Sequence, residues 1–181
     1  MHYPVAIALT KHEMKCKENK TFEKIVNFFV PEEDWKPSQV KDKPILNLEY
    51  DGRDGQWRCL AIAEETISFR KMIFYSIAPF YIRRESKQDI AEFLHRINYS
   101  INIGNFELNF DTGEVRCKTS VEVIKDNINS NLIFCIVENN LNLMSKYLGG
   151  IIAVNEGKLL PEEAEEIAKV EYPDWSAKQP D

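Results

Sequence analysis

The residues of this chain that could carry chemistry are its histidines, cysteines and neighbouring carboxylates. The three histidines and four cysteines are scattered and form neither an HExxH nor a CxxC motif. The nearest pair of metal-ligand type, His12 and Cys16, offers only two ligands. The sequence also holds neither a GxSxG nucleophile elbow nor a glycine-rich phosphate loop. We therefore expect no catalytic residue, no metal ligand and no bound cofactor, and a protein that is not an enzyme.

Cysteines and carboxylates each have a structural interpretation that fits their positions better. Cys59 and Cys117 fall in strand patterns and Cys135 in a helix pattern, so all three are predicted to be small buried residues. The carboxylate pair Asp51 and Asp54 lies in a glycine-containing turn sequence, as does the later pair of Asp111 with Glu114. There the side chains are expected to support the turn rather than acid–base chemistry.

Composition limits the classes of partner. A formal net charge of −6 argues against nucleic acid, because binding phosphates requires a basic surface. No run approaches the roughly 20 apolar residues of a membrane span, and no secretory signal is recognised, so we expect a cytoplasmic protein with no membrane association. The predicted organisation is an N-terminal extension (1–20), a single domain (21–171) and a loose C-terminal tail (172–181).

The elements follow from hydrophobic periodicity. An apolar stripe with helical spacing predicts a helix from Phe22 to Phe29 that Pro31 ends. Alternation then predicts three strands, at about 46–50, 57–64 and 67–78, with a turn at 51–55. Ser86 and Asp89 have the spacing of a capping box at the start of a second helix.

The second half of the chain continues the alternation. Residues 106–110 and 115–123 predict a hairpin that turns at 111–113, with Glu107 opposite Arg116 or Lys118 on its wet face. A long helix starts near Asn129 or Ser130, and a last acidic helix opens at Pro161. The sequence thus predicts an α+β fold with an antiparallel five-stranded sheet and helices mainly on one face. The expected order is helix, three strands, helix, two strands, helix, helix.

The second and third strands carry apolar residues on both faces. If Glu65 and Thr66 form a two-residue loop, Ile62 pairs with Phe69, Leu60 with Lys71 and Arg58 with Ile73. If helices cover one face, the other becomes a candidate surface for a second copy or a partner. The residues predicted for this partner or dimer surface are Arg58, Leu60, Ile62, Phe69, Lys71, Ile73 and Tyr75.

Asn140 is the one polar residue inside the apolar stripe of the long helix. A buried asparagine can bond to backbone groups of the core, or it can set the register between two subunits. Both interpretations stay open at the sequence level, and Asn140 is added to the candidate interface residues.

A family resemblance covers roughly residues 70–165. It rests on Asn98-Tyr99, on Gly104–Leu108 and Gly113–Arg116 in "NYSINIGNFELNFDTGEVRCKT", and on the later "ENNLNLMSKYLGGIIAV" and "LLPEEA". In these stretches the chain resembles the YbjN family of bacterial proteins, which are similar to type III secretion chaperones in fold. Gly149 and Gly150 stand where a proline would be expected. The resemblance implies a non-enzymatic, partner-binding module, and some members of the family are described as regulators of sensory transduction.

We therefore expect a protein-binding adaptor or chaperone-like regulator that forms a homodimer and whose protein partner is unknown. The alternative is a small-molecule-binding protein or an enzyme, with a pocket between the sheet and the helices.

Overall fold

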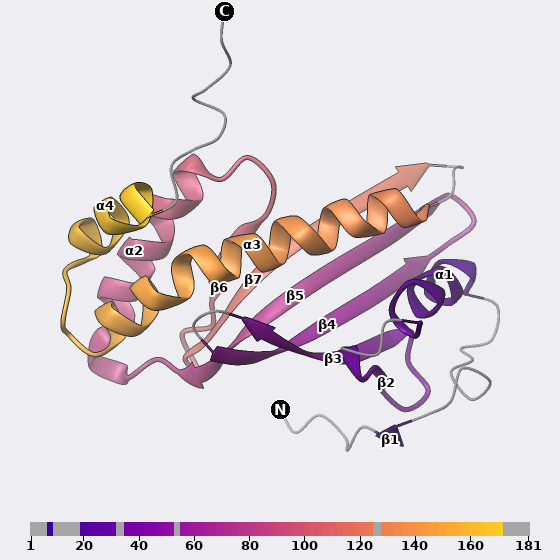
Figure 1. Cartoon of the computed structure of the whole chain (residues 1–181), viewed down its shortest axis with the longest axis horizontal. Coiled ribbons are helices and arrows are strands. Elements are labelled where there is room, and N and C mark those ends of the chain that lie inside the picture. Colours follow the sequence, from indigo (N-terminus) through magenta and orange to yellow (C-terminus); the bar gives the residue numbers. More distant parts are fainter. Residues whose placement is uncertain (1–6, 9–18, 32–34, 53–54, 125–127, 172–181) are drawn as a thin grey trace, which may run out of the picture.

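One open antiparallel sheet, covered by helices, forms the centre of the molecule (Figure 1). The structure is a computed structural model, and it describes residues 7–8, 19–31, 35–52, 55–124 and 128–171. The strand order across the sheet is β1-β2-β3-β4-β5-β7-β6. The strands are β1 (Ile7–Ala8), β2 (Ser38–Gln39), β3 (Ile45–Gly52), β4 (Gly55–Glu65), β5 (Phe69–Tyr81), β6 (Asn105–Leu108) and β7 (Glu114–Ile124). The helices are α1 (Lys20–Phe29), the short 3₁₀ turn η2 (Arg84–Ser86), α2 (Lys87–Ser100), α3 (Ser130–Asn155) and α4 (Pro161–Glu171).

The predicted α+β class and the open antiparallel sheet are confirmed. The predicted number of five strands is wrong, because two strands of two residues each, β1 and β2, extend the described sheet beyond β3. Alternation cannot be recognised in so short a segment, which is why the connection before β3 gave no strand signal.

Helix α1 forms where its apolar stripe was predicted. Asn19 caps it by accepting a hydrogen bond from the backbone N–H of Phe22, at 2.8 Å. The stripe residues Phe22, Ile25 and Phe29 are completely buried against the sheet. Helix α1 ends at Phe29, two residues before Pro31.

The β4–β5 hairpin has a different register from the one predicted. Ile62 pairs with Ile73 rather than Phe69, and Leu60 pairs with Tyr75, so the partners shift by four residues. The cause is Thr66, whose hydroxyl accepts hydrogen bonds from the backbone of Ser68 and Phe69 and builds a longer turn. Because four is an even number, every side chain keeps the face that was predicted for it.

The β6–β7 hairpin turns at the predicted place. Gly113 has a φ of +80°, and a Cβ atom built there would lie 2.7 Å from the carbonyl oxygen of Ile82. A glycine is therefore required both by the turn and by the neighbouring chain. On this hairpin Glu107 pairs with Arg116 at 2.7 Å, as expected from the sequence.

The outer edge of β6 is occupied by a side chain. The amide nitrogen of Asn98, near the end of α2, donates to the carbonyl of Phe106 at 3.0 Å, and its amide oxygen accepts from the Phe106 N–H at 2.8 Å. The Asn98 amide thus replaces a neighbouring strand. This contact gives a structural reason for Asn98 within the block that resembles the YbjN family.

The predicted capping box at the start of α2 is wrong. The Ser86 side chain caps no backbone N–H of the helix; instead its hydroxyl donates to the carbonyl oxygen of Asn155 at 2.9 Å. The Arg83 guanidinium donates to the same carbonyl. Asn155 is the last residue of α3, whose final carbonyl groups lack partners within the helix. The long-range contact therefore replaces the local cap.

Helix α3 runs across the sheet and continues through Gly149 and Gly150 (Figure 1). A Cβ atom at Gly150 would lie 2.8 Å from the ring of Phe93, so this glycine lets α2 approach α3 closely. Helices α2 and α4 gather at one end of α3 and α1 lies near the other. Together the helices bury one face of the sheet in a single apolar core.

Candidate functional site

The uncovered face of the sheet holds seven of the predicted interface residues. We call this surface the open face and define it by Arg58, Leu60, Ile62, Phe69, Lys71, Ile73 and Tyr75, together with their neighbours in the ladder, Ile77 and Ile124. The intervening residues, such as Cys59, Ala61 and Phe74, are completely buried under the helices. Among the described residues, no helix lies over the open face.

The centre of the open face is apolar. Ile62 pairs with Ile73, and Leu60 with Tyr75, while Ile77 extends the row along β5. Leu60 is only 6% exposed and Ile77 8%, although no described helix covers them. Ile62, Ile73 and Tyr75 are half-buried, whereas Ile124 at the margin is 74% exposed. Apolar surface of this kind favours contact with another molecule.

Ion pairs flank this apolar centre. Lys71 lies between Glu64 (3.4 Å) and Glu122 (3.1 Å) on the adjacent strands. The hydrogen bonds to Glu122 and Glu64 raise the pKa of Lys71, so its charge is stable at neutral pH. On the other side, the guanidinium of Arg116 lies 4.4 Å from the ring centre of Tyr75, in cation–π geometry. The open face therefore has an apolar middle and a charged margin.

Asn140 does not belong to the open face, and its inclusion among the interface residues is wrong. It is completely buried in the core of the chain. Its amide nitrogen donates to the carbonyls of Phe74 (3.1 Å) and Cys117 (3.2 Å) and contacts the hydroxyl of Thr119 (3.2 Å). Of the two interpretations left open, the structure thus selects the core asparagine that bonds to backbone groups.

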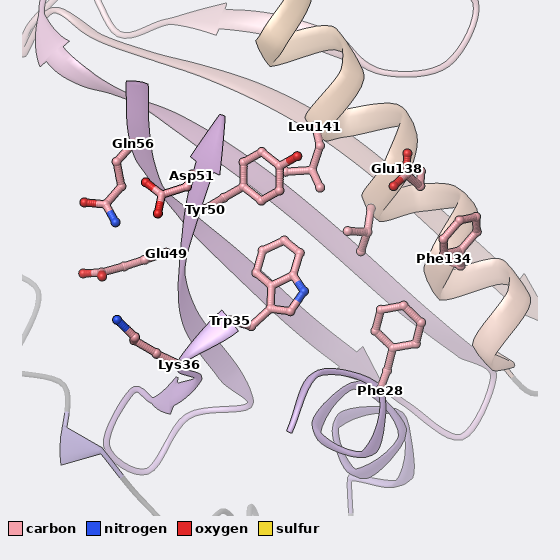
Figure 2. Close-up of a pocket in the computed structure, with 11 residues that line it drawn as sticks. Phe28, Trp35, Lys36, Glu49, Tyr50, Asp51, Gln56, Phe134, Glu138 and Leu141 are labelled. Atoms are coloured by element: carbon pink, nitrogen blue, oxygen red, sulfur yellow. The ribbon is translucent and has the colours of Figure 1, made fainter. Parts of the chain in front are cut away.

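A second feature is a pocket between the sheet and the helices, at the β3 side of the core. Figure 2 shows Trp35 and Tyr50 on one side of this pocket and Phe134, Glu138 and Leu141 of α3 on the other. The cavity has a volume of about 720 Å³, within the range of small-molecule sites. We call it the aromatic pocket. It is lined by Phe28, Trp35, Lys36, Glu49, Tyr50, Asp51, Gln56, Phe134, Val137, Glu138 and Leu141.

Packing fixes the sheet-side wall of the aromatic pocket. The Trp35 and Tyr50 rings lie 5.4 Å apart, and Trp35 also meets Phe29 edge-on at 5.1 Å. Tyr50 in turn contacts the buried ring of Trp57 at 5.0 Å. The wall is therefore continuous with the apolar core. The pKa of Tyr50 is raised, first by burial and then by the negative charge of Glu138 across the pocket.

The aromatic pocket was not identified from the sequence. Trp35 lies in a charged connection without periodicity, and Phe134 lies beside the apolar stripe of α3 rather than in it. The available signal was Phe134 itself, a large apolar residue at a helix position outside the stripe, and it is 54% exposed. The alternative prediction placed a pocket between sheet and helices, but it named no residue.

Among the described residues, the thiols and the remaining titratable groups offer no further site. Burial raises the pKa of Cys59 to about 12 and also raises the pKa of Cys117, so both thiols stay protonated and unreactive. Cys135 is exposed, which contradicts its predicted burial, and Cys16 lies outside the described residues. Within the described ranges, no three histidine, cysteine or acidic side chains are grouped to hold a metal ion. The helices of those ranges include none long and apolar enough to cross a membrane.

Comparison with known proteins adds no assignment: no protein-family model matches the chain, and no curated protein matches it either. The resemblance to the YbjN family therefore remains a prediction from the residues quoted above.

Proposed function

We propose that this chain is a cytoplasmic adaptor or chaperone-like regulator that binds another polypeptide across the open face and performs no chemistry. The observation that carries the proposal is the row formed by Leu60, Ile62, Ile73, Tyr75 and Ile77, which lies on the sheet face away from the described helices. The resemblance to the YbjN family, with its likeness to type III secretion chaperones, supports the same function.

A partner segment would use the centre and the margin of the open face differently. Ile62, Ile73 and Tyr75 offer apolar contact area at the centre, where desolvated anchors usually contribute most of the binding energy. Lys71 and Arg58 lie at the rim and would orient a partner by charge. An amphipathic helix laid across the strands fits this pattern. A second copy of the chain could use the same residues, and the proposed homodimer would then bury this face.

Affinity capture from native lysate tests the proposal with Phe69→Glu and Tyr75→Glu. A new carboxylate at position 69 has Lys71 nearby, and one at position 75 has Arg116, so both variants should fold. Tyr99→Glu is the matched control, because Tyr99 is 93% exposed on α2, away from the sheet. We expect specific partners to be lost with the first two variants and retained with the control. Partners that persist in both, with circular dichroism and melting temperature unchanged, would exclude the open face.

A second candidate function is small-molecule binding, and the aromatic pocket is the observation that favours it. Its volume and its aromatic lining suit a ligand rather than a structural void. Thermal-shift screening against metabolites and nucleotides tests this function. A saturable shift with one chemical class would support it, and uniform absence of a shift would count against it.

A further inference from the structure

The aromatic pocket combines ring faces with negative charge. Glu138 lies in its α3 wall, whereas the side chains of Glu49 and Asp51 on β3 point away from the rings, toward the sheet face that also holds Arg58 (Figure 2). Lys36 is the one basic residue among the eleven that line it. No ion pair joins Glu138 to a lysine or arginine within the described parts of the chain. Glu138 is therefore the acidic side chain that faces the rings of the pocket, and its charge also acts on Tyr50.

Polar atoms also face this space without protein partners. The ring nitrogen of Trp35 and the hydroxyl of Tyr50 form no hydrogen bond with any residue that the structure describes, and Figure 2 shows both on the side of α3. By contrast, the ring nitrogen of Trp57, which is buried behind Tyr50, donates to the Ser76 hydroxyl at 3.0 Å. The Trp57 ring nitrogen is thus satisfied within the core, whereas the polar atoms of Trp35 and Tyr50 remain available to a ligand.

The chain at the pocket rim is held in an unfavourable conformation. Lys36 has a φ of +42°, in the left-handed region that a side chain with a Cβ rarely adopts. This residue stands between Trp35, which packs on Tyr50, and Pro37, after which β2 begins at Ser38. Backbone strain of this kind tends to gather at binding sites, and here it lies next to the ring that packs on the pocket wall.

We propose that the aromatic pocket binds a small aromatic cation, such as an amidinium or a protonated amine on an aromatic ring. The ring would lie among Trp35, Phe28 and Phe134, and the positive charge would lie toward Glu138. Aromatic faces and an adjacent carboxylate both attract an organic cation, more strongly where water is partly excluded. An anion would be repelled by the charge of Glu138, and a neutral ring would leave that carboxylate, which accepts a hydrogen bond from Asn142 at 3.3 Å, without a positive partner. This inference rests on the second candidate function and does not depend on a partner at the open face.

Three probes of nearly the same shape test the charge directly: benzamidine (cationic), benzamide (neutral) and benzoate (anionic). The measurement is the indole N–H region of a ¹H–¹⁵N correlation spectrum of the full chain, which contains three tryptophans. Trp35→Phe identifies the Trp35 signal by its loss. The Trp57 signal is an internal control, since its N–H is buried and bonded to Ser76. We expect benzamidine to shift the Trp35 signal in a saturable manner. The dissociation constant from this titration should be at least about tenfold lower for benzamidine than for either other probe.

Two carboxamide variants complete the test. Glu138→Gln preserves the shape of the wall and removes the charge, so benzamidine affinity should fall about tenfold. Glu166→Gln, at an exposed position on α4 remote from the pocket, should leave the affinity unchanged. Equal binding of benzamide, or unchanged benzamidine affinity in Glu138→Gln, would overturn the proposal while leaving a pocket for neutral ligands. A Trp35 signal that no probe moves would overturn both the inference and the second candidate function.

Discussion

At the scale of single residues, Asn140 shows how one amide can fix the position of a helix on a sheet. It joins α3 to the backbone of both β5 and β7 through Phe74 and Cys117, and in doing so it donates to carbonyls far from it in the sequence. A buried acceptor that loses its donor retains the full desolvation penalty. Asn140 therefore specifies where α3 crosses the sheet, a role that an apolar residue of similar size would not supply.

Asn140→Leu should lower the free energy of unfolding by about 2–4 kcal/mol, because two buried carbonyls lose a donor. Urea unfolding followed by far-ultraviolet circular dichroism measures the change. Asn142→Leu is the control, since Asn142 is exposed on the same helix, and we expect a change within about 0.5 kcal/mol. Equal effects at the two positions would show that the buried amide has no special role.

At the scale of elements, Glu65 attaches the start of α1 to the end of β4. Its carboxylate accepts hydrogen bonds from the backbone N–H of Thr21 (2.9 Å) and from the Thr21 hydroxyl (3.0 Å), and it lies 3.2 Å from Arg70. Burial acts to raise the pKa of Glu65, but the two bonds from Thr21 and the charge of Arg70 together lower it below the ordinary 4.5. The contact satisfies a backbone N–H of the first helical turn that lacks a partner within the helix.

The lowered pKa predicts how stability changes with acid. A carboxyl whose pKa is depressed in the folded state contributes stability above its unfolded pKa, and this contribution is lost as the pH falls through the folded pKa. Glu65→Gln should therefore be about 1–2 kcal/mol less stable than the wild type at pH 7, and the difference should narrow below pH 4.5. Denaturant unfolding across this pH range measures it. A stability difference that stays constant with pH would refute this link between the Glu65 pKa and stability. Glu64→Gln is the control, because the Glu64 side chain is exposed.

The edge of β6 provides a second prediction at the element scale. Asn98→Ala removes both hydrogen bonds to Phe106 and leaves the strand edge open. The melting temperature should fall, with a loss of about 1–2 kcal/mol in unfolding free energy. Asn102→Ala is the control because Asn102 is exposed after the same helix. An unchanged melting temperature for Asn98→Ala would show that water satisfies this edge equally well.

At the scale of the whole molecule, the sheet is covered on one face by the described helices, and its other face has an apolar centre. A second copy of the chain would bury that centre, as the proposed homodimer requires. The wild type should therefore have twice the mass of a single chain in light scattering at micromolar concentrations. Tyr75→Glu should shift the equilibrium toward the monomer, whereas Tyr99→Glu should not. A wild-type chain that stays monomeric at high micromolar concentration would contradict the homodimer.

The sequence by itself determined those features that depend on local periodicity. The buried stripe of α1, the alternation of β7 and the turn at Gly113 each follow from side chains within one segment, because backbone geometry fixes which neighbours share a face. The division of β4 and β5 into two faces was also correct, for the same reason. Seven of the eight predicted interface residues therefore lie together on the open face.

Only the tertiary structure decided which distant groups meet. The hydroxyl of Ser86 bonds to Asn155 instead of capping its own helix, and Asn140 bonds within the core. The aromatic pocket is assembled from α1, the segment at Trp35, β3 and α3, and no periodicity within any one of these predicts the others. Hydrogen bonds and cavities depend on the distance between segments far apart in the chain, and that distance is set by packing of the whole core.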